Sequence, residues 1–362
     1  MELKSHKDRW SIGDSLAELA QLARTADAEV AGELIQRLEK PSPNYLGSGK
    51  LRELIALREQ SRYSVVICND ELSPQQQRNL EEALQVKIID RTALILDIFA
   101  RHALTREGQL QVELAQNEYL LPRLAGQWSH LERLGGGIGT RGPGESQLET
   151  DRRLVTQRIH RLKAEIEEVR RHRALYRQQR KRRGIPIVAL VGYTNAGKST
   201  LMNALSDANV LVEDKLFATL DPVTRRLTLS NGQQVLLTDT VGFIHKLPPT
   251  VVTAFRATLE ELNEADLFLH IVDITHKNAA EQCQTVEEVL DGLSLGNKPR
   301  LTILNKIDLL SENESSGEAL VASLMKEFKV ASQGMVPVSA AKGWGLQQLL
   351  DQISARIVML RD

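Results

Sequence analysis

The stretch "IPIVALVGYTNAGKST", residues 185 to 200, decides the fold of the second half of this chain. An apolar run of strand length leads into Gly192, and after four residues Gly197, Lys198 and Ser199 open a helical pattern. This order suits phosphate binding, because the glycines let backbone N–H groups turn inward, the lysine reaches the β- and γ-phosphates, and the serine hydroxyl binds Mg²⁺. The stretch therefore predicts a P-loop α/β domain with a mostly parallel sheet.

A second motif of the same site follows in "VLLTDTVGF", residues 235 to 243. Its apolar strand ends at Asp239, which is suited to hold a water of the metal ion. Gly242 follows three residues later, where a backbone N–H meets the γ-phosphate. Two such motifs at successive strand ends argue against a chance match.

The base of the nucleotide is predicted from "RLTILNKIDLL", residues 300 to 310, which places Asn305, Lys306 and Asp308 after a further strand. A carboxylate at Asp308 accepts from both N1–H and the exocyclic amine of guanine, whereas adenine presents an acceptor at N1. The motif therefore selects GTP over ATP. The loop expected to close around the base is Ser339, Ala340 and Ala341 in "MVPVSAAKG".

The segment "KLFATLDPVTRR", residues 215 to 226, is predicted to respond to the nucleotide. Thr219 is placed to ligate Mg²⁺ while the γ-phosphate is present and to let go after hydrolysis, which makes the segment an order–disorder switch. Thr224 is a weaker candidate for the same role.

The predicted site combines these segments. The residues expected to bind GTP or GDP are Gly192, Tyr193, Thr194, Asn195, Ala196, Gly197, Lys198, Ser199, Thr200, Phe217, Ala218, Thr219, Leu220, Asp221, Asp239, Thr240, Val241, Gly242, Asn305, Lys306, Asp308, Ser339, Ala340 and Ala341. Lys198, Thr219 and Gly242 are the predicted catalytic residues. Ser199, Thr219 and Asp239 are the predicted Mg²⁺ ligands.

Phe243 stands where many GTPases have a glutamine that positions the attacking water. A phenylalanine can neither orient nor polarise water. One hypothesis is that hydrolysis by the isolated protein is slow and that docking on RNA supplies the missing element. The alternative is that Phe243 packs in the core and another residue, near Thr219, orients the water unaided.

Asn195 lies inside the phosphate loop and allows two interpretations. Its amide oxygen could coordinate K⁺ between the phosphates and so replace an arginine finger, as in similar loops of potassium-activated GTPases. Alternatively, it caps or tightens the loop. The sequence does not decide between them.

Residues 1–108 are predicted to form an α/β domain with parallel strands. The runs "SVVICND" (64–70) and "VKIID" (86–90) have strand length, and Ser73, Pro74 and Gln76 supply a helix start with a capping box between them. Strand, helix and strand in this order indicate a right-handed parallel unit. By contrast, "LGSGKLREL" lacks the spacing of a phosphate loop and is interpreted as a turn in which Ser48 starts a helix from Lys50 to Arg58.

Residues 109–183 are predicted to form a long antiparallel helical hairpin, ahead of a GTPase domain at 184–362. One apolar stripe runs from Leu110 to Leu131, with a kink expected at Pro122, and a second begins at Val155. A capping box of Ser146 and Glu149 is expected to start the returning helix at Gln147. The six glycines between the stripes then fall in a tip loop at 132–146.

Positive charge is concentrated in the second helix of this hairpin. Residues 151–183 hold 13 Lys and Arg against 4 Asp and Glu, although the whole chain has a net charge of −1. This density favours a polyanion-binding surface over a merely solvated helix face. Arg133 and Arg141 in the tip loop are suited to contact phosphates or bases, so the loop is predicted to probe RNA. The basic cluster is Arg170, Arg171, Arg173, Arg180, Lys181, Arg182 and Arg183.

The cysteine content and the two ends of the chain argue against cysteine-ligated metal sites, redox proteins and membrane proteins. The two cysteines, Cys68 and Cys283, fit no metal or redox spacing, and neither end of the chain shows a targeting, lipidation or membrane-spanning pattern. We therefore expect a cytoplasmic, soluble protein with no membrane partner. A monomer is expected, because the hairpin leaves no apolar stripe unpaired.

The chain resembles the HflX family, ribosome-associated GTPases of the Obg-HflX branch of translation-factor-related P-loop proteins. The similarity is carried by "LGSGKLREL", "IDRTALILDIFA", "GGIGTRGPGESQLETDRR", "VGYTNAGKST", "LFATLDP", "DTVGFI" and "NKID". The resemblance implies that the N-terminal domain and helical arm engage the large (50S) ribosomal subunit and its rRNA near the peptidyl-transferase region. It also implies ribosome-stimulated GTP hydrolysis and a role in splitting or rescuing stalled ribosomes under stress. Longer members carry a further C-terminal domain, whereas "QISARIVMLRD" is expected here to be the closing helix of the GTPase domain.

Three functions compete. The favoured one is an enzyme that hydrolyses GTP to GDP and phosphate and thereby times its attachment to the ribosome. The alternative is a nucleotide-gated RNA-binding module in which hydrolysis is incidental. Phe243 supports this alternative, because it stands where many GTPases have a water-positioning glutamine. A GTPase that signals through proteins or a membrane is disfavoured by the missing lipidation signals and the basic arm.

Overall fold

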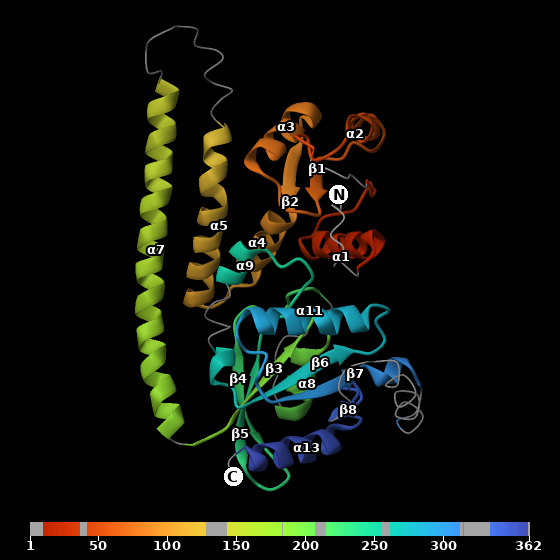
Figure 1. The fold of residues 1–362 in the computed structure, drawn as a ribbon, viewed down its shortest axis with the longest axis vertical. Helices are drawn as coiled ribbons and strands as arrows, with labels where there is room; N and C mark the ends of the chain where they lie inside the picture. The colour runs from red at the N-terminus through yellow and green to blue at the C-terminus, as the bar shows by residue number, and fades with distance from the viewer. Residues whose placement is uncertain are drawn as a thin grey trace. The chain divides into compact units, whose positions relative to one another are not determined.

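The computed structural model describes residues 10–36, 42–127, 143–182, 184–206, 215–254, 261–311, 314 and 334–360. The chain divides into two compact units, coloured along the sequence in Figure 1. Unit 1 comprises Met1–Arg170 and Pro248–Ala254, and unit 2 comprises Arg171–Leu247 and Phe255–Asp362. The helical arm is therefore grouped mostly with the N-terminal region.

Unit 1 contains the predicted parallel pair of strands. Strands β1 (Val65–Cys68) and β2 (Lys87–Asp90) pair in parallel, with Val65 opposite Lys87. Helix α3 (Pro74–Leu84) connects them and begins with the predicted capping box, in which Gln76 N donates to Ser73 Oγ at 3.2 Å. The prediction of strand, helix and strand is thus confirmed. Its apolar core is formed by Tyr45, Leu46, Cys68, Leu72, Leu80, Leu84 and Ile88.

Three further helices surround this pair: α1 (Ile12–Thr25), α2 (Ser48–Ser61) and α4 (Arg91–His102). Helix α2 differs from the sequence-based expectation, because it starts two residues before Lys50 and its N-cap is Gly47, without a side-chain cap. Ser48 therefore lies within the helix. A buried ion pair joins α4 to α1 through Arg91 and Glu18.

Helices α5 (Arg106–Gln127) and α7 (Pro143–Arg182) form the predicted antiparallel hairpin and run side by side in Figure 1. Their apolar stripes are partly buried, with Leu162 fully so. Pro122 lies inside α5, which continues past it to Gln127. Ion pairs between described residues cross the hairpin, among them Arg106–Glu165 at 2.8 Å, Arg158–Glu113 at 2.6 Å and Lys163–Glu118 at 2.8 Å.

The start of α7 corrects the sequence-based boundary. The helix begins at Pro143, so Ser146 lies in its first turns instead of capping it. Proline suits the first helical turn because its fixed φ is already helical and its missing N–H needs no partner there. The rest of the predicted tip loop, with Arg133 and Arg141, lies outside the described residues.

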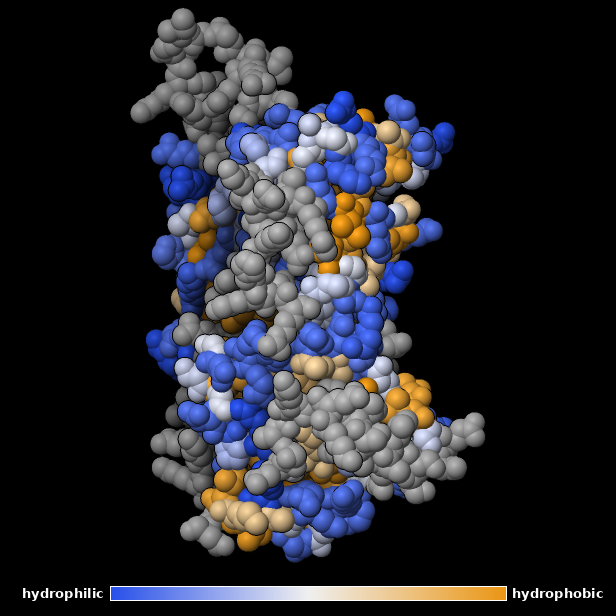
Figure 2. Space-filling view, turned by 45° about the vertical axis from the view of Figure 1, so that its right-hand side comes forward, coloured by the Kyte–Doolittle hydropathy of each residue, from blue (hydrophilic) through white to orange (hydrophobic). Residues whose placement is uncertain are grey.

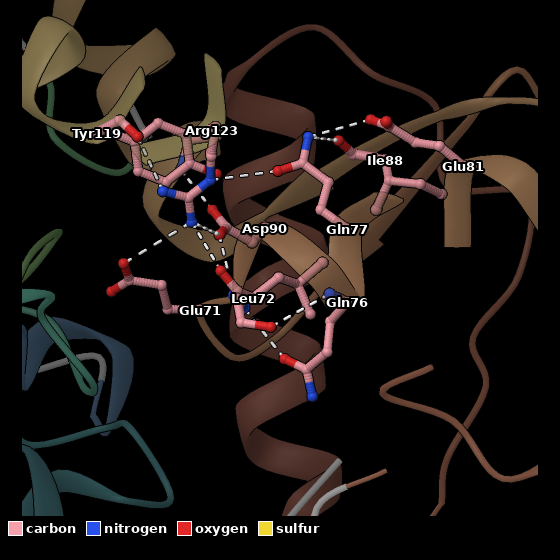
Figure 3. A network of polar contacts seen from close by, with 11 residues as sticks. Glu71, Leu72, Gln76, Gln77, Glu81, Ile88, Asp90, Tyr119 and Arg123 are labelled. Atoms are coloured by element: carbon pink, nitrogen blue, oxygen red, sulfur yellow. Dashed lines mark hydrogen bonds and ion pairs between the residues drawn. The ribbon is translucent and has the colours of Figure 1, made fainter. Parts of the chain in front are cut away.

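Arg123 of α5 ties the arm to the α/β part of unit 1. Its guanidinium donates to Asp90 at 3.2 Å, to the Leu72 carbonyl at 2.7 Å and to Gln77 at 3.2 Å. Figure 3 shows these contacts and the ring of Tyr119, whose centroid lies 3.5 Å from the guanidinium carbon. Because Arg123 is only 8% exposed, this network fixes the C-terminal part of α5 from within the core.

Unit 2 is built on a six-stranded sheet in the order β4-β5-β3-β6-β7-β8. All neighbours pair in parallel except β4 with β5. The mostly parallel sheet of the predicted P-loop domain is thus confirmed. The strands are β3 (Ile187–Gly192), β4 (Val223–Thr228), β5 (Gln234–Asp239), β6 (Leu267–Asp273), β7 (Arg300–Asn305) and β8 (Met335–Pro337).

Helices cover both faces of this sheet. Helices α8 (Lys198–Ser206) and α13 (Leu346–Met359) share one core cluster with it, and α11 (Ala279–Gly292) contributes to a second cluster. Figure 1 shows α11 and α13 on opposite sides of the strands. A short 3-10 helix, η1 (Ile307–Leu309), follows β7. The carboxyl ends of β3, β5 and β7 meet at one edge, where such folds bind ligands.

A short helix within the sequence of unit 2 belongs to unit 1. Helix α9 (Pro249–Ala254) contacts α4 and α5, and Val251 is fully buried. The chain thus passes to unit 1 after Leu247 and returns at Phe255.

The visible surface is mainly hydrophilic, with apolar residues in separate small areas of the face shown in Figure 2. Single exposed apolar side chains, such as Leu104 and Leu309, are ordinary on protein surfaces. Among the described helices, none combines the length and apolar character needed to cross a membrane.

Candidate functional site

The predicted phosphate loop connects β3 to α8 at the edge where the strands end. Gly197 has φ of +95°, and a Cβ there would lie 2.3 Å from Asn305 Nδ2. Glycine is therefore required, both for the backbone conformation and for the close approach of Asn305 at the end of β7. Asn195 also has a positive φ, of 61°, and is exposed.

Lys198 lies at the centre of the loop and is only 6% exposed. Its ammonium donates to the carbonyls of Gly192 at 3.3 Å and Tyr193 at 2.8 Å. Burial lowers the pKa of Lys198 to about 8, and the charge of Asp239 opposes that shift. The cavity beside it is lined by Thr194, Asn195, Gly197, Lys198, Ser199, Thr200, Lys215, Phe217, Ala218, Thr219, Thr240 and Gly242.

The three predicted metal ligands meet within hydrogen-bonding distance. Ser199 Oγ donates to Asp239 Oδ2 at 2.6 Å and lies 2.8 Å from Thr219 Oγ1, which donates to the same carboxylate oxygen at 3.3 Å. Asp239 is fully buried, and its Oδ1 has no hydrogen-bond partner among the described residues. Burial raises the pKa of Asp239, against the effects of Lys198 and the Ser199 hydroxyl.

Such a cluster fits a small, hard cation. Hydroxyl and carboxylate oxygens are the ligands that Mg²⁺ prefers, and a buried carboxylate oxygen without a partner favours an added positive charge. Thr224, the weaker candidate, lies in β4 instead and is 3.0 Å from Thr238 Oγ1. The geometry thus brings Thr219 to the cluster, and not Thr224.

The segment around Thr219 is anchored on the phosphate loop. Phe217 N donates to Thr194 Oγ1 at 2.8 Å, and Phe217 is buried with φ of +59°. Leu220 is also buried in the core, as is Val241 of the second motif. Phe217 and Thr219 are among the residues that line the cavity, whereas Leu220 and Val241 are part of the packing.

Gly242 abuts the phosphate loop. A Cβ there would lie 2.6 Å from Thr194 Cα and 3.0 Å from Lys198 Nζ, so no larger residue fits. The next residue, Phe243, is 2% exposed and forms a parallel bridge with Tyr193. The core packing considered for Phe243 is confirmed, and its ring is not available to the cavity.

The residues predicted to read guanine also come together. Asn305 Nδ2 donates to the Ala196 carbonyl at 2.9 Å, and its Oδ1 accepts from Ala340 N at 3.1 Å. Ser339 Oγ donates to Asp308 Oδ1 at 2.6 Å. These bonds connect the end of β7, predicted to read the base, to both the phosphate loop and the loop predicted to close around it.

Two residues of the site were not predicted. Lys215 lines the cavity, and Asp273 at the end of β6 pairs with Lys306 at 2.7 Å. Asp273 also accepts from Thr275 N at 3.0 Å, which fixes the carboxylate that holds the lysine. The position of Asp273 at the end of a strand could have identified it from the sequence. Lys215 belongs to no motif in the sequence and carries no such signal.

The basic cluster of α7 is partly neutralised. Arg170 pairs with Glu167 at 3.1 Å, and Arg173 lies 3.5 Å from Glu261. The side chains of Arg180 to Arg183 lie outside the described residues, so the structure leaves the polyanion-binding surface as a prediction.

Three family models match successive parts of the chain. Residues 13–100 match a model described as GTP-binding GTPase N-terminal, and residues 102–180 match GTP-binding GTPase Middle Region. Residues 187–306, which contain the phosphate loop and reach Lys306, match 50S ribosome-binding GTPase.

Full-length relatives agree with these matches. GTPase HflX of Lacrimispora saccharolytica is 51% identical over 97% of this chain and 83% of its own length. The chain belongs to the HflX family of GTPases. Its relative from Caldanaerobacter subterraneus, also a GTPase HflX, is 56% identical over 82% of this chain and 70% of its own length.

A solved structure is similar along nearly the whole chain. The crystal structure of SsGBP in complex with GDP is 28% identical, covers 95% of both chains and has a TM-score of 0.50. The family and the site together establish a GTP-binding, GTP-hydrolysing enzyme with a domain of the 50S ribosome-binding GTPase type.

Proposed function

We propose that this HflX-family GTPase associates with the large ribosomal subunit and its rRNA in the cytoplasm, and that GTP binding and hydrolysis time the attachment. The observation that carries this proposal is the match of residues 187–306 to 50S ribosome-binding GTPases. The N-terminal unit and the helical arm are proposed to contact the subunit. The resulting task is the splitting or rescue of stalled ribosomes under stress.

The metal ion of this reaction is proposed to be Mg²⁺, held by Ser199, Thr219 and Asp239. When bound, it neutralises charge that develops on the β- and γ-phosphates. Lys198 binds the same phosphates from within the loop, and the backbone N–H of Gly242 donates to the γ-phosphate. Because Thr219 belongs to a separate segment, loss of the γ-phosphate releases it and reports the nucleotide state.

Hydrolysis by the isolated protein is proposed to be slow. Phe243 is buried, so the residue after Gly242 cannot orient the attacking water. Docking on the ribosome then supplies or arranges the missing element. Single-turnover hydrolysis with and without large subunits tests this, and equal rates would contradict it.

Asn195 is proposed to coordinate K⁺ beside the phosphates. It lines the cavity, and its exposed side chain is not committed to the core. The competing role, tightening of the loop, is compatible with its φ of +61°. Replacing K⁺ by Na⁺ should lower the hydrolysis rate. An unchanged rate would favour the role in the loop.

Cosedimentation with large ribosomal subunits tests the attachment. A non-hydrolysable GTP analogue should retain more protein on the subunit than GDP, whereas binding that ignored the nucleotide would argue against a timing switch. Replacing Arg141 and its neighbouring glycines by alanine should weaken attachment and leave guanine-nucleotide affinity intact. Arg106→Ala, at the other end of the arm, is the matched control for loss of one exposed positive charge.

The second candidate is an RNA-binding module gated by the nucleotide, in which hydrolysis is incidental. The buried Phe243 favours it, because the site lacks the usual water-positioning glutamine. Thr219→Ala separates the two functions, since it should slow hydrolysis more than GTP binding. Slower release of this variant from the subunit would support the timing switch, and unchanged release would support the module.

A further inference from the structure

Two adjacent side chains of the phosphate loop contact the two segments that respond to the nucleotide. Tyr193 is 3% exposed, and its hydroxyl oxygen accepts a hydrogen bond from His245 N at 2.7 Å. His245 lies three residues after Gly242. The phosphate loop thus holds the backbone directly beyond the glycine that donates to the γ-phosphate.

Backbone hydrogen bonds reinforce this contact. Thr194 N donates to the Phe243 carbonyl at 2.8 Å, and Phe243 N donates to the Gly192 carbonyl at 3.1 Å. Together with the Tyr193 hydroxyl, they attach residues 243–245 to the phosphate loop at three points. Since Gly242 also has no space toward Thr194, its amide is held between fixed neighbours.

Thr194 makes the corresponding contact with the other segment. Its Oγ1 accepts from Phe217 N at 2.8 Å, two residues before Thr219. A phenylalanine with φ of +59° adopts a left-handed conformation, which is unfavourable for an L-residue with a Cβ. The hydrogen bond and the burial of the Phe217 ring offset that cost and thereby set the direction in which the chain reaches Thr219.

We propose that Tyr193 and Thr194 are positioning residues for GTP hydrolysis. Tyr193 fixes the position of the Gly242 amide through its contact with His245. Thr194 fixes the position of the Thr219 hydroxyl through its contact with Phe217. Neither side-chain contact involves the reacting atoms. The proposal rests on the GTPase activity of this family and is independent of ribosome attachment.

The chemistry of the two side chains makes the proposal specific. In both contacts an oxygen of the phosphate loop accepts from a backbone N–H, so only the oxygen is needed and not the rest of the side chain. Tyr193→Phe keeps the ring and removes the oxygen, and Thr194→Val keeps the shape and removes the oxygen. Thr194→Ser keeps the oxygen and tests for recovery.

Single-turnover GTP hydrolysis by the isolated protein, with GDP and GTP-analogue affinities, tests the proposal. Tyr193→Phe and Thr194→Val should each lower the rate constant about tenfold, the equivalent of one hydrogen bond of about 1.4 kcal/mol. GDP affinity should stay within about twofold, because GDP has no γ-phosphate to be sensed. Thr194→Ser should recover most of the rate lost in Thr194→Val.

Tyr63→Phe is the matched control. Tyr63 lies in unit 1, and its hydroxyl donates to the Leu54 carbonyl at 2.7 Å, so its removal costs a comparable bond without touching the site. Its hydrolysis rate should equal that of the unchanged protein. Thermal unfolding of every variant separates a loss of fold from a loss of positioning.

Two results would overturn the proposal. One is an unchanged rate constant in both Tyr193→Phe and Thr194→Val. The other is a loss of GDP affinity that parallels the loss of rate, because this would mean that the phosphate loop itself had deformed. A folded Thr194→Val protein that Thr194→Ser fails to surpass counts against the role of Thr194 in the same way.

Discussion

Asp90 and Asp239 occupy equivalent strand-end positions in the two units, but their carboxylates differ in hydrogen-bond partners. Each ends a parallel strand, and each is almost completely buried. Asp90 Oδ1 accepts from Ala93 N at 2.8 Å, and its Oδ2 accepts from Leu72 N at 3.0 Å and from Arg123. Asp239 Oδ2 accepts from the hydroxyls of Ser199 and Thr219, and its Oδ1 has no hydrogen-bond partner among the described residues.

The difference separates a carboxylate whose partners all come from the fold from one that is predicted to hold a metal ion. The protein supplies a cation to Asp90 from its own sequence, because Arg123 forms an ion pair with it at 3.2 Å. The charge of Lys198 also acts on Asp239, but its ammonium donates to the carbonyls of the phosphate loop. A buried carboxylate left incomplete costs free energy of folding, and a ligand cation recovers it.

The largest effect is expected from Arg123→Ala, which leaves Asp90 buried without its cation. The free energy of unfolding of unit 1 should fall by about 3–5 kcal/mol. Chemical denaturation measures it. Arg101→Ala is the matched control, because Arg101 forms ion pairs at the surface, and it should cost about 1 kcal/mol or less. Equal effects of the two variants would remove the contrast between the two aspartates.

Asp239→Asn should lower the rate of GTP hydrolysis and leave stability intact, the opposite of Arg123→Ala. GTP hydrolysis should fall by about a hundredfold or more, since a metal ligand contributes several kcal/mol to the transition state. Stability in EDTA should not fall, because burial raises the pKa of Asp239 and the amide carries no charge to desolvate. A strong loss of stability in EDTA would place Asp239 in the same class as Asp90.

His270 provides a third case, a buried group whose Nδ1 lies 3.6 Å from Glu287 Oε1 but whose charged form is disfavoured mainly by burial. Burial lowers its pKa to about 4 from 6.5, and the charge of Arg300 acts in the same direction. The unfolded chain therefore binds a proton that the folded chain does not. The contribution of the neutral His270 imidazole to the free energy of unfolding is fully present above about pH 6.5. The free energy of unfolding should decline by up to about 3 kcal/mol as the pH falls to 4.

His270→Gln should remove that part of the pH dependence, as followed by urea denaturation between pH 7 and 4. GTP hydrolysis at pH 7 should change little, because His270 lies in the middle of β6 and outside the cavity lining. An identical pH profile in this variant would show that other groups cause the decline.

The smallest effect is expected from Thr224→Val, because the Thr224 hydroxyl contacts Thr238 and not the predicted metal ligands. Its bond to Thr238 at 3.0 Å lies within the sheet, so stability should fall by about 1 kcal/mol and hydrolysis should be unchanged. Thr219→Ala is the comparison for the hydrolysis rate. A large loss of rate in Thr224→Val would reverse the assignment of the two threonines.

Much of the fold was predictable because its signals are local. Ser73, Pro74 and Gln76 specify a helix start within four residues, and the phosphate loop specifies the strand before it and the helix after it. The start of α7 was misplaced because two local signals compete there, a capping box at Ser146 and a proline at Pro143. Only the structure shows that the helix extends back to the proline.

The site was predictable where side chains carry the chemistry, and less so where backbone groups do. Ser199, Thr219 and Asp239 were assembled from spacing, although their roles as ligands stay a prediction. The bond from His245 N to Tyr193 could not be foreseen, because a backbone donor leaves no trace in the residue type. The same holds for Arg123 and Asp90, since 33 residues separate them and many other carboxylates were available.

Helix α9 makes the architecture discontinuous. Because Pro249–Ala254 interrupts the GTPase sequence and belongs to unit 1, no single cut between residues separates the two units. A recombinant fragment that begins at residue 184 would carry this helix without α4 and α5, with Val251 uncovered. Dissecting the protein into independent parts therefore requires excising or replacing this helix, and a simple truncation gives a misleading measure of the GTPase on its own.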